Sequence, residues 1–201
     1  PIGQLARGRS LTRLAVLTLM LTGGRVTPVR AGDWPQILGP TRAGIAVDEH
    51  LPAQLTGTLK PRWTHPLGQG YAGPAVVGQR VYVFHRLDEQ EVLEALDAAT
   101  GQSIWRAEFA ADYRGGIDSD TGPRCVPLVA QDTIVVHGAA GAVHAVRAAD
   151  GQRLWSRDLL RDLGGSEGYF GAGSAPIVVG DRVLINTGGR QRAGIGALEL
   201  K

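Results

Sequence analysis

The chain has 201 residues, of which 29 are glycine and 11 proline, and 20% are charged. This composition is typical of a globular, turn-rich protein and argues against a disordered one. The formal net charge is +2, but five arginines lie in residues 1–31, and the remainder has 16 basic against 19 acidic residues, a net charge of −3. Because no basic stripe remains, we expect no nucleic-acid binding.

Residues 1–31 are expected to be a signal peptide. Arg7, Arg9 and Arg13 precede the apolar run 14–21, and Val29 and Ala31 provide small residues where a signal peptidase cleaves. The run is shorter than the ~20 apolar residues that span a bilayer. We therefore expect export to the periplasm or the extracellular space and no transmembrane span after cleavage. An uncleaved membrane anchor is the alternative.

Residues 32–59 are interpreted as an irregular lead-in, because proline and glycine interrupt them and they show no strand or helix periodicity. The segment 60–67 then places Trp63 in a strand-like stretch that resembles the end of a repeat whose beginning is absent. Propellers commonly close their ring by lending a strand from one terminus to the blade at the other. We predict that 60–67 is this closing strand and that its sheet partners lie beyond Lys201.

Residues 95–105 recur at 145–155, without a gap, at a shift of 50 positions, and a third copy begins at Ala197. Each copy reads as an apolar strand, a turn that closes on glycine, and a second strand with a tryptophan. Segments 74–83, 127–136 and 176–185 also align, each as two strands around a tight turn. Together they predict four-stranded antiparallel blades at 71–110 and 122–160 and a partial blade at 173–201. The expected fold is an all-β propeller, present as an incomplete ring of about three and a half blades.

The repeat assigns structural roles to several residues. Trp105 and Trp155 are expected to wedge between neighbouring sheets, and Gly101 and Gly151 to supply the positive φ of their turns. Cys125 is the only cysteine, so no internal disulfide forms, and we expect a small buried residue at a strand start rather than a reactive thiol. Because the sequence begins without methionine and stops inside a repeat, we expect a fragment whose exposed sheet edges promote aggregation.

The longest irregular segments, 112–124 and 162–173, each connect one repeat to the next. Such connections emerge at one end of a propeller, where a rigid scaffold usually carries its binding groups. We predict a binding site there, formed by Tyr113, Asp118, Asp120, Arg124, Glu167, Tyr169 and Phe170.

Other chemistry receives little support from these segments. Arg124 could contact an anion in the channel or pair with a loop carboxylate. Asp118 and Asp120 could bind calcium, but carboxylates in a glycine-rich loop are usually solvated, so we assign no metal. His85 and His137 end the second strand of a repeat and are expected at the surface or at strand ends. No nucleophile elbow or dinucleotide fingerprint is present, and no catalytic residue is assigned.

The pattern Ala-Leu-Asp-x-x-Thr-Gly-x-x-x-Trp at 95–105 resembles the repeat of pyrroloquinoline-quinone (PQQ) enzymes. Ala95, Asp97, Thr100, Gly101 and Trp105 match it; in the second copy Arg147 and Asp150 replace the aspartate and the threonine. The lead-in that begins Asp33-Trp34-Pro35-Gln36 is similar to the start of secreted bacterial PQQ-like propellers. The repeat occurs in quinoprotein dehydrogenases and in cofactor-free relatives such as the outer-membrane-assembly lipoprotein propeller, so the resemblance implies the fold but not the activity.

In the quinoprotein dehydrogenases, many sites stack PQQ against a disulfide of adjacent cysteines, and calcium is held by Glu and Asn beside a catalytic Asp. This chain has one cysteine and one asparagine, Asn186. We therefore expect a cofactor-free interaction propeller that binds a protein or a polysaccharide on its loop end. The alternative is a PQQ- and calcium-dependent dehydrogenase, oxidising an alcohol or a sugar, whose site is completed by missing blades.

Overall fold

The computed structural model describes residues 32–46, 49, 54, 57–117, 119–165, 168–188 and 194–201. The expected signal peptide at 1–31 lies outside the described residues. Residues 1–30 and 31–201 form separate units, and the description below concerns the second. Within the described ranges, no helix has the length and apolar character needed to cross a membrane.

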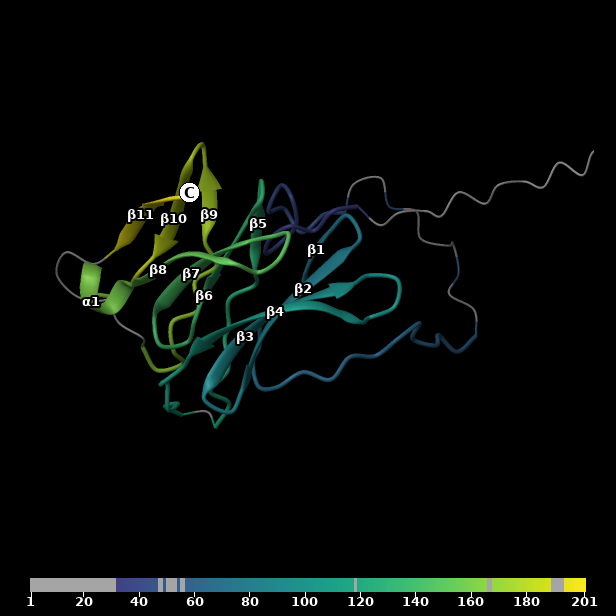
Figure 1. The fold of residues 1–201 in the computed structure, drawn as a ribbon, viewed down its shortest axis with the longest axis horizontal. Helices are drawn as coiled ribbons and strands as arrows, with labels where there is room; N and C mark the ends of the chain where they lie inside the picture. Colours follow the sequence, from purple (N-terminus) through teal and green to yellow (C-terminus); the bar gives the residue numbers. More distant parts are fainter. Residues whose placement is uncertain are drawn as a thin grey trace, which may run out of the picture. The chain divides into compact units, whose positions relative to one another are not determined.

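Nearly all of the regular secondary structure in the second unit is antiparallel sheet (Figure 1). The first sheet contains β1 (Ala75–Val77), β2 (Arg80–Leu87), β3 (Gln90–Asp97) and β4 (Ser103–Ala110), in that order. The second contains β5 (Leu128–Ala130), β6 (Thr133–His137), β7 (Ala142–Arg147) and β8 (Arg153–Asp158). The third contains β9 (Ile177–Val179), β10 (Arg182–Asn186) and β11 (Ile195–Glu199).

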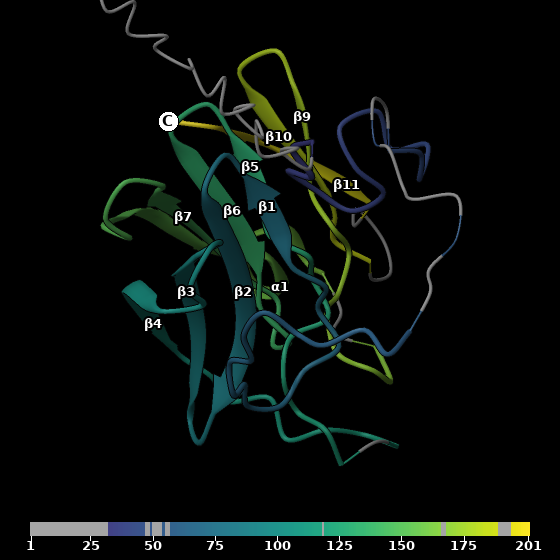
Figure 2. The same cartoon turned by 90° about the vertical axis from the view of Figure 1, so that its right-hand side faces the viewer.

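The predicted incomplete propeller is confirmed, with two four-stranded sheets and one three-stranded sheet. This is less than the expected three and a half blades, because segment 60–67 forms no strand. The first strands of the sheets, β1, β5 and β9, follow one another along the same side in both views (Figures 1 and 2). Each sheet is thus one blade, with its short first strand next to that of its neighbour.

Each blade face packs on the next blade, and the pleat of β6 shows how. Ile134 and Val136 belong to a core cluster shared with Phe84 and Leu93 of the first sheet. Val135, between them, belongs to a cluster shared with Val183 of the third sheet. Successive side chains of a strand point to opposite faces, so an unbroken apolar run fits a strand that is buried on both sides.

The tryptophans pack against the neighbouring blade, as the repeat predicted. The Trp105 indole Nε1 donates to the Ala148 carbonyl oxygen at 3.3 Å, and a Cβ atom on Gly151 would lie 2.5 Å from the Trp105 ring. Gly101 and Gly151 have φ of 71° and 75°, a region open to glycine but strained for other residues. Glycine is therefore required at 151 both for the turn and for the close approach of the indole.

The same contact occurs at each repeat. The Trp63 Nε1 donates to the Ala98 carbonyl oxygen at 3.0 Å, and the Trp155 Nε1 donates to the Leu200 carbonyl oxygen at 3.3 Å. Trp63 therefore occupies the place that an outer-strand tryptophan of a preceding blade would take. That 60–67 completes a blade whose other strands lie beyond Lys201 remains a prediction.

A paired substitution explains why the second copy departs from the repeat pattern. In the first turn, Asp97 Oδ1 accepts hydrogen bonds from the Thr100 backbone N–H, at 2.8 Å, and hydroxyl, at 2.9 Å. In the second turn, Arg147 Nη1 donates to Asp150 Oδ2 at 2.9 Å. The carboxylate thus lies at the first position of the first turn and at the fourth position of the second turn. In both turns the side chains at these two positions are hydrogen-bonded to each other.

The lead-in is more ordered than its sequence indicated. Trp34 pairs with Val76 of β1 in an antiparallel bridge, and the Val129 N–H of β5 donates to the Pro35 carbonyl oxygen at 2.8 Å. Asp33 Oδ1 accepts the Gly78 N–H at 2.8 Å. The lead-in thus connects the first strands of two blades and satisfies backbone groups that a sheet edge would otherwise expose.

A short helix, α1 (Leu159–Leu163), follows β8, where we expected only the end of a blade and an irregular segment. The Asp158 carboxylate caps its N-terminus by accepting the Arg161 N–H, and Gly164 ends it with φ of 67°. Leu159 is buried in the core between the second and third sheets. The helix therefore fixes where the chain leaves the second blade.

Candidate functional site

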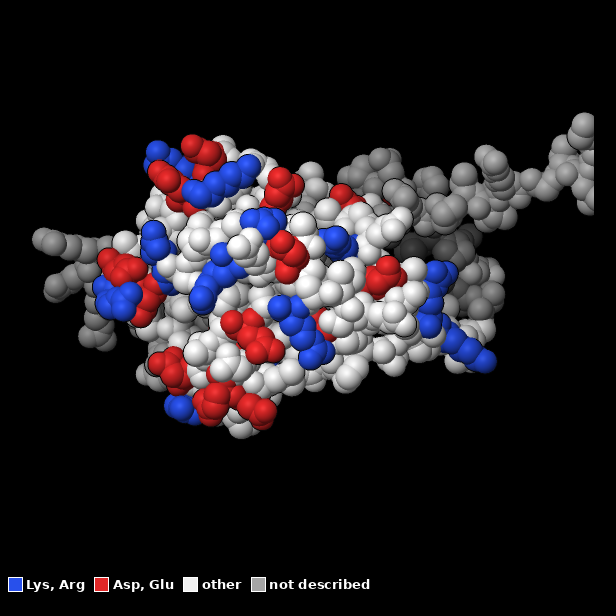
Figure 3. Space-filling view, viewed as in Figure 1, with Lys and Arg blue, Asp and Glu red and all other residues white. Residues whose placement is uncertain are grey.

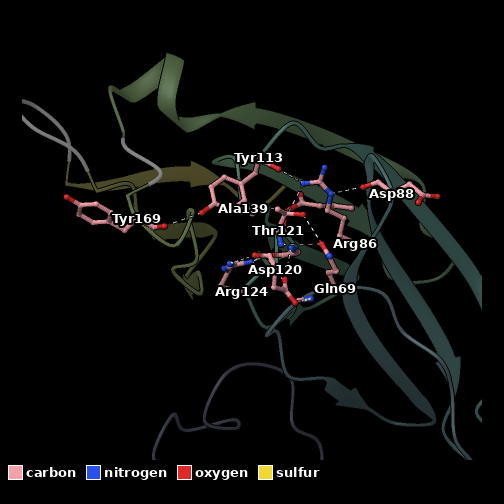
Figure 4. A network of polar contacts seen from close by, with 12 residues as sticks. Gln69, Arg86, Asp88, Tyr113, Asp120, Thr121, Arg124, Ala139 and Tyr169 are labelled. Atoms are coloured by element: carbon pink, nitrogen blue, oxygen red, sulfur yellow. Dashed lines mark hydrogen bonds and ion pairs between the residues drawn. The ribbon is translucent and has the colours of Figure 1, made fainter. Parts of the chain in front are cut away.

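The predicted binding loops lie on a buried polar network centred on Arg86 of β2 (Figure 4). The guanidinium group donates to the carbonyl oxygens of Asp88 at 2.7 Å, Tyr113 at 2.6 Å and Ala111 at 3.1 Å. Arg86 is 5% exposed, so these bonds form in a low-dielectric environment where charge-assisted hydrogen bonds are strong. Arg86 therefore fixes the β2–β3 turn and the start of the loop after β4.

Asp120 and Arg124 hold the second half of the same loop. Asp120 Oδ2 accepts the Gly70 N–H at 3.0 Å, and Asp120 Oδ1 accepts the Gly122 N–H at 2.9 Å. Arg124 Nη2 donates to the Asp120 carbonyl oxygen at 2.7 Å, and its guanidinium carbon lies 5.2 Å and 5.6 Å from the ring centroids of Tyr71 and Tyr113. Of the two roles considered for Arg124, the structure shows the ion pair, with Nη1 3.6 Å from Asp120 Oδ1.

Among the predicted site residues, two aromatic side chains face solvent. Tyr169 and Phe170 are 77% and 59% exposed, whereas Tyr113 is buried and its hydroxyl donates to the Tyr169 carbonyl oxygen at 3.3 Å. Figure 4 shows the Tyr169 ring directed away from the network that holds its backbone. Asp118 and Glu167 lie outside the described residues.

Ile117 adds a third exposed apolar side chain, which sequence reasoning missed. It is 75% exposed and follows Gly116, where a Cβ atom would lie 2.5 Å from the Tyr169 carbonyl oxygen. The two predicted loops therefore touch, and Ile117, Tyr169 and Phe170 form what we term the loop-end patch. Large apolar side chains grouped on the surface of a well-anchored loop are typical of interaction sites.

A second polar cluster surrounds Glu94 in the middle of β3. Its carboxylate contacts Arg106 Nε at 2.9 Å, His65 Nε2 at 3.2 Å and His85 Nε2 at 3.5 Å, and Glu94 is fully buried. Burial alone raises the pKa of Glu94, but hydrogen bonds from Ser103, Arg106 and His65 outweigh it, and the pKa is lowered. The Glu94 carboxylate is therefore buried and ionised, and its contact with His65 joins segment 60–67 to the first blade.

The His85 ring orientation argues against a metal at this cluster. The Gly68 N–H donates to His85 Nδ1 at 3.0 Å, so Nδ1 is the acceptor and the neutral ring carries its hydrogen on Nε2, facing Glu94. A metal ligand needs a free lone pair on that nitrogen. Within the described ranges, no group of three His, Cys, Asp or Glu side chains could hold a metal ion.

Of the two expected positions, the surface is wrong for both His85 and His137, which are 3% and 2% exposed, whereas the strand end is confirmed for His137. His137 does end β6, but its Nδ1 donates to the Ser174 carbonyl oxygen at 3.2 Å, and burial lowers its pKa. His144 Nδ1 lies 2.8 Å from Ser156 Oγ, and its ring stacks on Phe109 at 3.9 Å. Burial lowers the pKa of His144 to about 4, so the ring is neutral at pH 7.

Cys125 is fully buried, as predicted, and burial raises the pKa of its thiol to about 12. A thiol of this kind is not ionised at neutral pH and is a poor nucleophile. The structure therefore supports a packing role for Cys125 just before β5.

The described residues do not fit the PQQ and calcium set that the resemblance implies. Cys125 has no adjacent cysteine, and Asn186 is exposed with its Oδ1 accepting the Gly188 N–H at 3.0 Å. The carboxylates of the buried residues Glu91 and Glu94 already accept hydrogen bonds, from the Ala139 N–H and from Arg106 Nε respectively.

Comparison with known proteins identifies the family. A family model described as outer membrane protein assembly factor BamB matches residues 47–199. BamB of Burkholderia pseudomallei (strain K96243) is 28% identical over 153 residues, covering 59% of this chain and 39% of that protein. BamB of Shewanella oneidensis is 26% identical over 150 residues, covering 70% of this chain and 35% of that protein.

The solved structures agree on the fold. Quinohemoprotein alcohol dehydrogenase from Comamonas testosteroni superposes with a TM-score of 0.51 at 25% identity, over 67% of this chain and 20% of that one. The chain spans less than two fifths of the curated relatives and a fifth of the dehydrogenase. The family match covers most of the chain and confirms the PQQ-like repeat, so this chain belongs to the BamB family of PQQ-like propeller proteins.

Proposed function

We propose that this protein is a periplasmic propeller that works as a cofactor-free scaffold in outer membrane protein assembly. We further propose that the loop-end patch is where it binds a protein partner. In this view residues 1–31 direct export, and residues 60–67 close the ring. The relatives carry the name of an assembly factor, which favours a protein over a polysaccharide as the partner.

The observation that carries this proposal is that the side chains of the loop-end patch are exposed, whereas the residues that hold its loops in place are buried. Tyr169, Phe170 and Ile117 are each more than half exposed, while Arg86 and Tyr113 beneath them are buried and hydrogen-bonded. Rigid aromatic side chains lose little conformational entropy on binding and are enriched among the residues that dominate interface energies.

A binding experiment with a matched control tests the proposal. The full-length protein is immobilised, and its affinity for the purified outer membrane assembly machinery of its host is measured. The double variant Tyr169→Ala/Phe170→Ala is expected to bind at least about tenfold more weakly, because interface aromatics commonly contribute more than about 1 kcal/mol each. Ile104→Ala, a 47% exposed residue near the opposite end of β4, is the control and should bind as wild type. No binding by wild type, or equal loss in both variants, would refute the proposal.

A further inference from the structure

A polar groove of about 450 Å³ lies beside the loop-end patch, between the first and second blades. It opens where β4 runs into the loop at 111–117 and where β8 runs into α1. Its charged lining residues are Glu91, Asp112, Arg114, Asp158 and Arg161. Tyr113 and Gly115 line the groove and belong to the same loop as Ile117 of the loop-end patch, so the groove and the patch lie side by side on that loop.

Glu91, at the start of β3, is the buried group of this groove. It is 3% exposed, and its Oε1 accepts the Ala139 N–H at 2.7 Å. Its Oε2 lies against Gly138, where a Cβ atom would come within 2.1 Å, and receives no hydrogen bond from the described residues. A carboxylate can accept about four hydrogen bonds, so Glu91 Oε2, which has no donor among the described residues, can accept a hydrogen bond from a group in the groove.

The cations near the groove do not neutralise Glu91 from within it. Arg114 Nη1 contacts both carboxylate oxygens of Glu89, at 2.9 Å and 3.1 Å, and Arg161 Nε contacts Asp162 Oδ1 at 3.2 Å. Burial raises the pKa of Glu91, and the Ala139 N–H, Arg86 and Arg124 act against this rise from the protein side. The guanidinium groups of Arg86 and Arg124 donate to backbone carbonyls and not to Glu91.

The acidic residues of the groove have fewer charged partners than its arginines. Asp158 accepts the Arg161 N–H, and Asp112 forms no ion pair within the described ranges. In Figure 3, carboxylate groups gather around α1 and below it, toward the loop that follows β4, with guanidinium groups between them. The groove therefore has an excess of carboxylates with unfilled acceptor positions, and it favours a cation.

We propose that this groove binds a basic side chain, lysine or arginine, of the protein partner, with the Glu91 carboxylate as its acceptor. That the basic side chain belongs to a protein rests on the proposed function, whereas the preference of the groove for a cation does not. A charge-assisted hydrogen bond to the open Glu91 oxygen would form away from bulk water, where such bonds are strongest. The patch would supply apolar contact and the groove would set the position of a charged residue.

The test uses a small cation, so that it is independent of any partner. n-Butylguanidinium chloride is titrated into the full-length protein, with sodium chloride at equal ionic strength as the reference. The Ala139 amide resonance is followed by NMR, because that N–H donates to Glu91. We expect a saturable shift with n-butylguanidinium and none with sodium.

Two variants and a control make the result specific. Glu91→Gln keeps the acceptor for Ala139 but removes the charge, and should weaken n-butylguanidinium binding by about tenfold or more. Asp112→Asn, at the exposed rim, should weaken it severalfold even if the Glu91 variant does not fold. Glu108→Gln, an exposed residue of β4 outside the groove lining, should leave binding unchanged.

Absence of a saturable shift, or equal binding by Glu91→Gln and wild type, would overturn the groove assignment. Its failure is distinguishable from failure of the proposed function. If the groove fails but the assembly machinery still binds through Tyr169 and Phe170, the proposed function stands alone. If n-butylguanidinium binds and the machinery does not, the groove is a cation site without the partner proposed for it.

Discussion

Replacing Gly151 by alanine tests the contact between the Trp105 indole of the first blade and the turn of the second blade. Gly151 has φ of 75°, and a Cβ atom there would meet the Trp105 ring at 2.5 Å. Gly180, in the turn between β9 and β10, has φ of 65°, but a Cβ atom would have nothing within 4 Å. The two glycines share the backbone requirement, and only Gly151 carries the contact with a tryptophan.

The magnitudes follow from this difference. Alanine in the left-handed region costs roughly 1–2 kcal/mol at either position. At 151 the indole must also withdraw. Truncating a fully buried aromatic side chain to alanine costs about 3–5 kcal/mol of stability. Trp105 is only half-buried, so we expect displacement of its ring to cost about 2 kcal/mol. Gly151→Ala should therefore lower the free energy of unfolding by about 2 kcal/mol more than Gly180→Ala.

Urea unfolding of the full-length protein, followed by circular dichroism, measures both values. A double-mutant cycle adds a second check: in a Trp105→Ala background, Gly151→Ala should cost no more than Gly180→Ala, because the clashing ring is gone. Equal costs for the two glycine variants in the wild-type background would refute the claim that the indole is held against the turn.

Three further outcomes follow from the buried groups and from the cofactor test. The pKa of His144 is lowered from 6.5 to about 4, so its contribution to stability is complete above pH 6.5 and is lost as the pH falls toward 4. This contribution is about 3 kcal/mol, and His144→Leu should flatten the pH dependence measured by urea unfolding between pH 7 and 4.5. Cys125, with a thiol pKa of about 12, should not react with a disulfide reagent at pH 8 in the native protein and should react once urea unfolds it; rapid native reaction would show that the thiol is accessible. PQQ with calcium should not raise the melting temperature of the full-length, metal-stripped protein, and saturable binding with dye reduction by an alcohol or a sugar would instead support a dehydrogenase.

The sequence predicted the structure best within the hairpin of each repeat. The recurrence at 95–105 and 145–155 predicts two strands, a glycine turn and a packed tryptophan, and all of these occur. Even the departure at Arg147 and Asp150 preserves a bridge across the turn. The strands and the turn depend on residues a few positions apart, so periodicity alone can show them. The tryptophan contact spans 43 positions, from Trp105 to Ala148, but the recurrence of the tryptophan in each copy indicated it.

The parts that the sequence did not reveal depend on distant partners. Arg86 is buried because carbonyl groups from the loop after β4 surround it, and nothing in its own strand indicates that. The Trp34 bridge to Val76 joins residues 42 positions apart in a stretch without periodicity. Arg86 could have been noticed as a charged residue beside the apolar run 81–84, but its role required the fold.

The same limit applies to the candidate site. Position between repeats correctly placed Tyr169 and Phe170 on exposed loops, because connections in a propeller emerge at its ends. It could not separate them from Tyr113 and Arg124, which lie in the other predicted loop but are largely buried. Which loop residue faces solvent is decided by hydrogen bonds such as that from the Tyr113 hydroxyl to the Tyr169 carbonyl oxygen.

Site-specific photocrosslinking in cells tests the central claim most directly. A photoreactive phenylalanine analogue is placed at Tyr169, and at Ile104 as the control, in the full-length protein produced in its host. The account predicts a crosslinked product between position 169 and a component of the outer membrane assembly machinery, and none from position 104. No product from position 169, or the same product from both positions, would contradict the assignment of the loop end as the partner-binding surface.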